Sequence, residues 1–320
     1  MMEGGPSIQH RPVMQQEINA WLLSSEPVVS VDCTLGAGGH ARDLLQTSPA
    51  SGVVIGIDRD PACIAAARDW GRPWAQRFVP VYGDFRDLAV LLARSGHPQV
   101  DVILFDLGVS SYQLDTAARG FSFRLDGPLD MRMDTTQDYT AGVLVNQASR
   151  EELHTILRTF GEERWAGRIA RAIVDKRRHV PITRTRALAD LVAATIPRAA
   201  WPLRIHPATR VFQALRIAVN DELVALHTAL PQAVAALRPH GRLGVVAFHS
   251  LEDRDVKRCF QQEAKGCLCP PRFPQCVCGR RPRLKLLTRK PLVPTCEEIQ
   301  QNPRSRSARF RVVEKLDTEE

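Results

Sequence analysis

The stretch that decides the fold is VVSVDCTLGAGGH at residues 28–40. Its first four residues include three valines, and β-branched side chains suit a buried parallel strand. Asp32 stands near the end of this strand, and three glycines follow before a helix predicted at 41–46. In an open α/β sheet, ligands bind outside the carboxyl ends of the strands, beside such a crossover. Glycines at that point allow a tight turn and let a ligand approach the backbone closely.

A glycine turn of this kind fits phosphates, dinucleotides and sulfonium nucleotides, and three features narrow the choice. No GKS or GKT triplet follows, as a phosphate-binding loop would require. The spacing GAGGH differs from G-x-G-x-x-G, because the bulky His40 follows the adjacent glycines. Asp32 favours a ligand that carries positive charge, so a methyl donor with a sulfonium and an amino-acid tail fits better than a pyrophosphate. The alternative is a structural turn that binds nothing.

Length and composition are those of an ordinary globular protein. The 320 residues suffice for one large domain or two smaller ones, and 44% are hydrophobic and 24% charged. The sequence contains no run of about 18 apolar residues, so no membrane span is predicted. The N-terminal stretch MMEGGPSIQHRP lacks the apolar core of a signal peptide, so we expect a cytoplasmic protein. The net charge of +8 favours an acidic partner, most commonly nucleic acid. A merely basic enzyme is the alternative.

A second predicted strand, at 53–57, ends in Asp58. This carboxylate lies about 20 residues beyond the glycine turn, where acidic side chains meet ribose hydroxyls in nucleotide-binding folds. The alternative role is a charge at a helix N-terminus, which suits Asp60 better. We therefore predict that Asp58 contacts the ligand.

Two further strands end in residues that suit a ligand pocket. The strand at 78–82 is followed by Asp84 and Phe85, which can hydrogen-bond to a purine and stack on it, or else cap a helix and fill the core. The strand at 102–105 ends in Asp106, which is well placed to meet a reacting group. The pattern predicts one ligand contact at each strand end.

The alternation of strands and helices stops between about 115 and 205. Helices are expected at 141–147, 150–160, 163–175 and 186–196. A helical block that interrupts a doubly wound sheet is most simply an inserted domain, which gives a first sheet part at 1–114, an insertion at 115–205 and a second sheet part at 206–320. Arg164, Arg168 and Arg171 would share one helical face, which suits either RNA phosphates or plain solvation.

The second sheet part supplies the remaining elements. Helices are expected at 211–220, 222–237 and 251–260, the last capped by Ser250 with Asp253, and strands at 241–248, 284–287 and 308–313. His249, after the fifth strand, is expected to be a packed histidine. Seven strands with a late antiparallel pair predict the Rossmann-like, doubly wound sheet of a class I AdoMet-dependent methyltransferase.

A cysteine-rich basic loop lies at 265–283, KGCLCPPRFPQCVCGRRPR. Its two C-x-C pairs, separated by six residues, are Cys267, Cys269, Cys276 and Cys278. They could supply four thiolates to zinc, or remain reduced thiols in a basic loop. The arginines and lysines around them make this segment the best candidate in the chain for contacts with phosphate.

Taken together, the motifs resemble the RsmH/MraW family of small-subunit rRNA cytosine-N4 methyltransferases. The resemblance rests on motifs that span nearly the whole chain: DCTLGAGGH at 32–40, GIDRDP at 56–61, DLGVSSYQLD at 106–115, RGFSFRLDGPLDMRMD at 119–134, GEERWAGRIARAI at 161–173, HPATRVFQALRIAVNDEL at 206–223, FHSLEDRDVKR at 248–258 and NPRSRSARFR at 302–311.

The resemblance implies methyl transfer from S-adenosyl-L-methionine (AdoMet) to the N4 amine of one cytidine in the decoding region of 16S rRNA. It implies a helical domain inserted after the fourth strand, and a partner that is the small ribosomal subunit or its rRNA rather than DNA or a membrane. No metal is assigned to the site. The implied cofactor contacts are Gly38, Gly39, His40, Asp58, Phe85, Asp106 and Gln113.

Asp106 is the candidate catalytic residue, with the loop of Ser110 and Ser111 beside it in the chain. The sequence departs from the family at Tyr112, where proline is common, and at Ala41, where serine is frequent; the cysteine-rich stretch occurs in only part of the family. A DNA amino methyltransferase is disfavoured, because the S/D/N-P-P-Y/F motif is missing. The other hypothesis is an RNA-binding assembly factor with a vestigial cofactor pocket.

Overall fold

The computed structural model describes residues 12–23, 29–203, 205–265, 267, 269, 275 and 277–317. The chain divides into two compact units, which we call the sheet unit and the helical unit. The sheet unit comprises Met1–Gly108 with Val224–Glu320, and the helical unit comprises Val109–Leu223. Each unit is described by itself.

The sheet unit is built on a seven-stranded sheet in the order β3-β2-β1-β4-β5-β7-β6. Strands β1 to β5 pair in parallel, whereas β7 is antiparallel to both β5 and β6. This order, with its late antiparallel pair, confirms the predicted class I methyltransferase sheet. The strands are β1 (Val29–Asp32), β2 (Val53–Asp58), β3 (Phe78–Tyr82), β4 (Val100–Asp106), β5 (Leu237–Ala247), β6 (Leu284–Leu286) and β7 (Arg309–Lys315).

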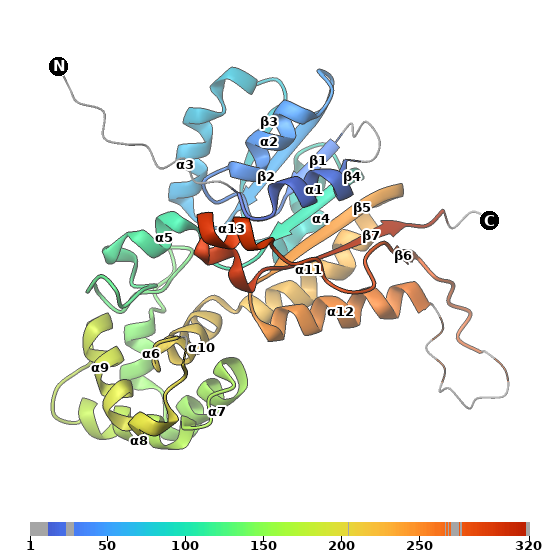
Figure 1. Ribbon diagram of the computed structural model, residues 1–320. Helices are drawn as coiled ribbons and strands as arrows, with labels where there is room; N and C mark the ends of the chain where they lie inside the picture. Colours follow the sequence, from blue (N-terminus) through green and yellow to red (C-terminus); the bar gives the residue numbers. More distant parts are fainter. Residues whose placement is uncertain are drawn as a thin grey trace, which may run out of the picture. The chain divides into compact units, whose positions relative to one another are not determined.

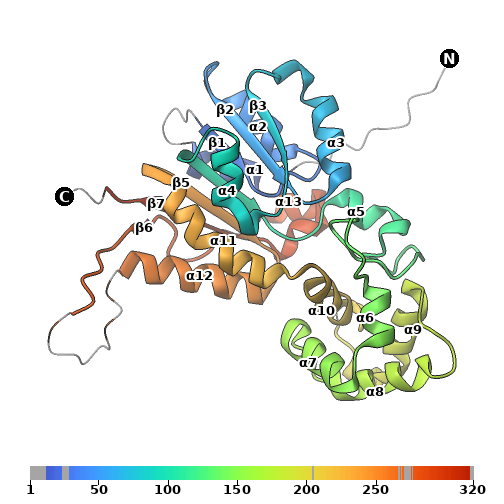
Figure 2. The same ribbon diagram turned by 180° about the vertical axis from the view of Figure 1, so that it is seen from behind.

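Helices cover both faces of this sheet, as Figures 1 and 2 show from opposite sides. The helices on one face are α1 (Gln15–Leu22), α2 (Gly39–Thr47) and α3 (Pro61–Trp70), and those on the other are α4 (Leu88–Arg94), α11 (Glu222–Ala236) and α12 (Ser250–Lys265). Along β4, Ile103 and Phe105 enter the core under α4 and α11, while Val102 and Leu104 enter the core under α1. Burial on both faces explains why this strand is an unbroken apolar run.

The helical unit has its own core. Its helices are α5 (Ser111–Asp115), α6 (Ala141–Gln147), α7 (Arg150–Gly161), α8 (Ala166–Arg177), α9 (Thr185–Thr195) and α10 (Thr209–Asn220). We expected the second sheet part to begin at 206, but α10 belongs to the helical unit. The reason is that Val211, Phe212 and Leu215 are buried in the core that α6 to α9 share. The described ranges contain no helix that is long and apolar enough to cross a membrane.

The basic face that we expected on the third helix of this unit is only partly formed. Helix α8 begins at Ala166, so Arg164 precedes it and does not share its face. Arg168 lies over the ring of Trp165, and Arg171 forms an exposed ion pair with Asp175. These contacts agree better with the solvated-helix alternative than with a surface reserved for phosphates.

Two helices were not predicted. Helix α5 has only five residues, too few for a recognisable apolar period, and it is stabilised by a capping box at Ser110. Helix α13 (Cys296–Gln301) is also short and has no buried residue. It nevertheless meets α1, because the Met14 N–H donates a hydrogen bond of 2.8 Å to Oε1 of Glu298.

Candidate active site at the carboxyl edge of the sheet

Three aspartates end adjacent parallel strands, as predicted. Asp32 is the last residue of β1, Asp58 the last of β2 and Asp106 the last of β4. Because β2, β1 and β4 are neighbours in the sheet, the three carboxylates lie along one edge. Strand order therefore brings together residues from three distant parts of the sequence.

Thr34 fastens the end of β1 to the end of β4. Its backbone N–H donates to Oδ1 of Asp32 at 3.1 Å, while its Oγ1 accepts the backbone N–H of Asp106 at 2.7 Å. Sequence reasoning missed this residue, although a threonine two positions after a strand-ending aspartate is a turn signal. Thr34 thereby fixes the backbone from which both carboxylates project.

Asp58 holds the glycine turn. Its carboxylate accepts the backbone N–H of Gly36 at 2.7 Å and that of Asp60 at 2.8 Å. Asp60 caps α3 by accepting the Ala62 N–H, so it has the role at a helix N-terminus that suited it better than Asp58. Asp58 thus stabilises the backbone at the carboxyl edge of the sheet, and its contact with a ribose stays a prediction.

The two glycines before His40 are required by packing. Gly38 has a φ of +80°, and a Cβ there would lie 2.2 Å from an atom of the Trp70 ring. At Gly39, a Cβ would lie 2.7 Å from the ring of Pro12. Only glycine leaves room for these rings, so both glycines serve the fold, and their contact with a cofactor stays a prediction.

His40 interacts electrostatically with two of these carboxylates, Asp106 and Asp32. Its side chain, in the first turn of α2, is 7% exposed, and Nε2 lies 3.5 Å from Oδ2 of Asp106. Burial by itself would lower the pKa of His40, but Asp106 and Asp32 outweigh it and the pKa is raised. Burial raises the pKa of Asp32 to about 6 despite the opposing charge of His40.

The same edge offers unused hydrogen-bond acceptors. Among the residues that the structure describes, Oδ2 of Asp32 and Oδ1 of Asp106 are buried without a hydrogen-bond partner. Buried polar atoms are rarely left unsatisfied unless a ligand, ion or water completes them. Two carboxylate oxygens suit a ligand with N–H donors and positive charge, which is what the ammonium and sulfonium of AdoMet provide.

The residues after β3 divide between structure and ligand. Asp84 caps the short 3-10 helix at Phe85–Asp87 and forms an ion pair with Arg59 at 3.2 Å. Of its two predicted roles, the structure therefore supports the helix cap. Phe85 packs edge-to-face on Phe105 with the ring centroids 5.5 Å apart. Its predicted contact with a purine is not tested by this packing.

Gln113 lies in the helical unit and has a local partner. Its side chain accepts the Ser110 N–H at 3.1 Å, and its own N–H donates to Oγ of Ser110 at 3.2 Å. These two bonds form the capping box of α5, and the side chain is buried. Its role as a cofactor contact remains a prediction.

The strand end at β5 corrects one expectation. His249 is packed, as predicted, with Nε2 3.1 Å from Oε1 of Glu252. At the start of α12, however, the partners are His249 and Glu252: Nδ1 of His249 accepts the Glu252 N–H at 3.4 Å, and Oε2 of Glu252 accepts the N–H groups of Phe248 and His249. Asp253 instead binds the buried guanidinium of Arg311.

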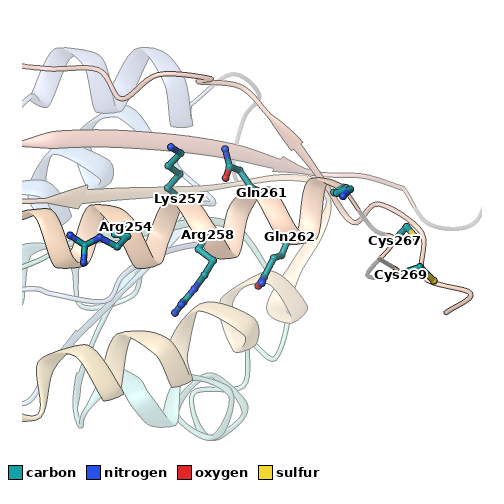
Figure 3. Close-up of a pocket in the computed structure, with 8 residues that line it drawn as sticks. Arg254, Lys257, Arg258, Gln261, Gln262, Cys267 and Cys269 are labelled. Atoms are coloured by element: carbon teal, nitrogen blue, oxygen red, sulfur yellow. The ribbon is translucent and has the colours of Figure 1, made fainter. Parts of the chain in front are cut away.

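A hollow of about 460 Å³ runs along α12 and beyond its end. Its lining is mostly cationic and amide side chains, with two thiols past the helix terminus (Figure 3): Arg254, Lys257, Arg258, Gln261, Gln262, Lys265, Cys267 and Cys269. Such a surface favours an anionic partner. Of the predicted phosphate-contact segment at 265–283, Lys265, Cys267 and Cys269 line this hollow. Part of that segment, Cys276 included, lies outside the described residues, and its contact with phosphate stays a prediction.

Comparison with known proteins gives the chain close relatives over its whole length. The model of the MraW methylase family matches residues 7–316. A protein of Geobacter sulfurreducens named ribosomal RNA small subunit methyltransferase H is 52% identical, with 97% of this chain and all of the relative covered. A protein of Thermomicrobium roseum with the same name is 52% identical over 98% of this chain and 96% of the relative.

Proposed function

We propose, from the premise that this chain belongs to the MraW methylase family, that it methylates the N4 amine of one cytidine in 16S rRNA. Its relatives make it an AdoMet-dependent methyltransferase of small-subunit rRNA. The choice of cytidine N4 comes from the resemblance of its motifs and from the chemistry of the site. The carrying observation is the pair of unsatisfied acceptors in the sheet unit, Oδ2 of Asp32 and Oδ1 of Asp106, with His40 3.5 Å from the other oxygen of Asp106.

The donor site follows from these acceptors. Asp32 would accept hydrogen bonds from the ammonium of the donor's amino-acid tail, and Asp58 would accept them from its ribose. Phe85, the glycine turn and Gln113 are the further contacts that the resemblance implies. When bound, AdoMet supplies a methyl group on a positively charged sulfur.

Asp106 is the residue we assign to the acceptor amine. The N4 lone pair of cytosine is delocalised into the ring, so the amine must be held in line with the breaking bond. Oδ1 of Asp106 would accept an N–H of the amine, while Nε2 of His40 lies 3.5 Å from the other oxygen of the same carboxylate. Positioning of this kind contributes on the order of 7–11 kcal/mol at best. The base must be single-stranded or flipped out to reach it.

We assign contact with the RNA to the cationic surface along α12. Lys257 and Lys265 are exposed cations on α12, and exposed lysines neutralise phosphates without reading sequence. An rRNA substrate supports a cytoplasmic location, because small subunits assemble in the cytoplasm.

The test is incubation of Asp106→Asn and wild-type protein with labelled AdoMet and undermethylated small subunits, followed by mass mapping of the nucleoside. We expect N4-methylcytidine from the wild type and at least a hundredfold lower turnover from the variant, with its melting temperature retained. Asp69→Asn, in an exposed ion pair with Arg72, is the matched control. Near-normal turnover by Asp106→Asn refutes the assignment.

Calorimetry with AdoMet separates the enzyme from the assembly-factor hypothesis. We expect saturable binding by the wild type at a single site. Absence of binding, together with retained affinity for the small subunit, would favour a vestigial cofactor pocket.

A further inference from the structure

Three thiols converge beyond the end of α12. The sulfur atoms of Cys267, Cys269 and Cys278 all lie within 4.8 Å of one another. The Sγ atoms of Cys267 and Cys278 are 3.8 Å apart. Tetrahedral zinc with Zn–S bonds of about 2.3 Å separates its sulfur ligands by about 3.8 Å, whereas a disulfide joins them at about 2.05 Å. The spacing therefore suits sulfur ligands that share a metal ion.

A glutamate at the base of the loop brings the thiols together. Glu263 of α12 forms ion pairs with Arg280 at 3.0 Å and with Arg283 at 3.4 Å. Its backbone carbonyl also accepts the Arg283 N–H at 2.9 Å. These contacts close the segment 265–283 at its base, so Cys267 near its start meets Cys278 near its end.

The surroundings of the cluster favour thiolates. The hollow that Cys267 and Cys269 line is also lined by four cationic side chains: Arg254, Lys257, Arg258 and Lys265. Figure 3 labels all of these residues except Lys265. The thiolate is the form of cysteine that binds metal, and a cationic lining stabilises the negative charge of a site built from several thiolates. Cys259 lies outside this cluster, and burial raises the pKa of its thiol to about 11.

We propose that Cys267, Cys269 and Cys278 bind one Zn²⁺ ion as thiolates. Three soft sulfur ligands select zinc over the hard cations Mg²⁺ and Ca²⁺. The ion ties the start of the cysteine-rich segment to its end and holds it beside the cationic side of α12. This assignment stands apart from the methyl-transfer site, which uses none of these residues.

The test is the zinc content of the full-length protein, purified without chelators and measured by mass spectrometry of the metal. We expect about one zinc per chain in the wild type and a loss of at least tenfold in Cys267→Ser, Cys269→Ser and Cys278→Ser. Cys296→Ser changes an exposed cysteine outside the cluster and should keep the metal. AdoMet calorimetry on each variant shows that the sheet unit is folded.

A second readout uses the wild-type protein alone. After chelation, Co²⁺ should restore one equivalent of metal and give the thiolate-to-cobalt charge-transfer absorption that marks sulfur ligands. Zinc retained in all three cluster variants overturns the proposal. So does metal-free wild-type protein that shows no cobalt band, or an intact mass lower by two hydrogens that reveals a disulfide in the cluster.

Discussion

Nε2 of His40 lies 3.5 Å from Oδ2 of Asp106, which joins the first turn of α2 to the end of β4. The two residues meet because β1, which leads into α2, pairs in parallel with β4. Oδ1 of the same carboxylate is buried without a hydrogen-bond partner among the described residues, so this edge of the sheet has unused acceptor capacity beside an ionisable pair.

Asp32→Asn should stabilise the ligand-free protein at neutral pH. Burial raises the pKa of Asp32 from 3.8 to about 6, so the folded state holds a proton that the unfolded state has lost. Stability therefore falls as the pH rises from about 4 to 6, and the full cost, on the order of 3 kcal/mol, is present above that range. Urea unfolding should show the variant more stable at pH 7.5 and equal to the wild type near pH 4. Equal stability at pH 7.5 contradicts this.

AdoMet should bind more tightly as the pH rises from 5 to 7. A cationic ligand prefers ionised carboxylates, and burial raises the pKa values of both Asp32 and Asp58 to about 6. Binding near pH 6 should therefore release protons, which calorimetry detects as heats that differ between buffers of different ionisation enthalpy. Asp32→Asn should flatten the pH dependence. An affinity that is flat or higher at pH 5 would count against these roles.

Gly38→Ala should destabilise the protein far more than Gly96→Ala. Both glycines have a φ of +80°, which costs an alanine about 1–2 kcal/mol. A Cβ at Gly38 also meets the Trp70 ring at 2.2 Å, whereas a Cβ at Gly96 meets nothing within 4 Å. We expect an additional loss of about 1–3 kcal/mol at Gly38 in urea unfolding. Equal losses at the two sites would show that Trp70 moves aside freely.

Asp253→Ala should cost about 3–5 kcal/mol of stability. Its carboxylate accepts from Nε of Arg311 at 2.7 Å, and removing it leaves a buried guanidinium without its counter-charge. Burial alone would raise the pKa of Asp253, but Arg311 and Arg309 lower it, so this stabilisation is present above about pH 4 and is lost as the pH falls through the lowered value. Asp69→Ala, in an exposed pair, should cost less than about 1 kcal/mol. Similar losses in the two variants would disprove the distinction.

Lys257→Gln and Lys265→Gln should each weaken RNA binding several-fold without changing AdoMet affinity. Each lysine that neutralises a phosphate of single-stranded RNA contributes about 0.7 to the slope of log affinity against log salt. Fluorescence anisotropy with a fragment of 16S rRNA at several salt concentrations measures this slope. Arg72→Gln removes one exposed cation elsewhere on the sheet unit and should leave the slope unchanged. An unchanged slope in both lysine variants would remove α12 from the RNA surface.

Much of the fold could be predicted because its signals are local. The valines of β1, the glycine turn and the Asp60 cap act within a few residues, so they can be recognised without knowing the rest of the chain. The same holds for Ser149 followed three residues later by Glu152, a local pattern that forms the capping box of α7. Short helices such as α5 were not predicted, because five residues are too few to show a helical repeat of apolar side chains.

By itself, the sequence determined the class of the sheet, its insertion of helices and the aspartates that end its strands, since periodicity and turn chemistry are written in neighbouring residues. Only the tertiary structure decided which side chains meet. The contacts of Thr34 with Asp106 and of Asp58 with Gly36 depend on which strands become neighbours. The placement of α10 in the helical unit depends on which core buries its apolar face. Strand order and core membership arise from the packing of the whole chain, and no local spacing encodes them.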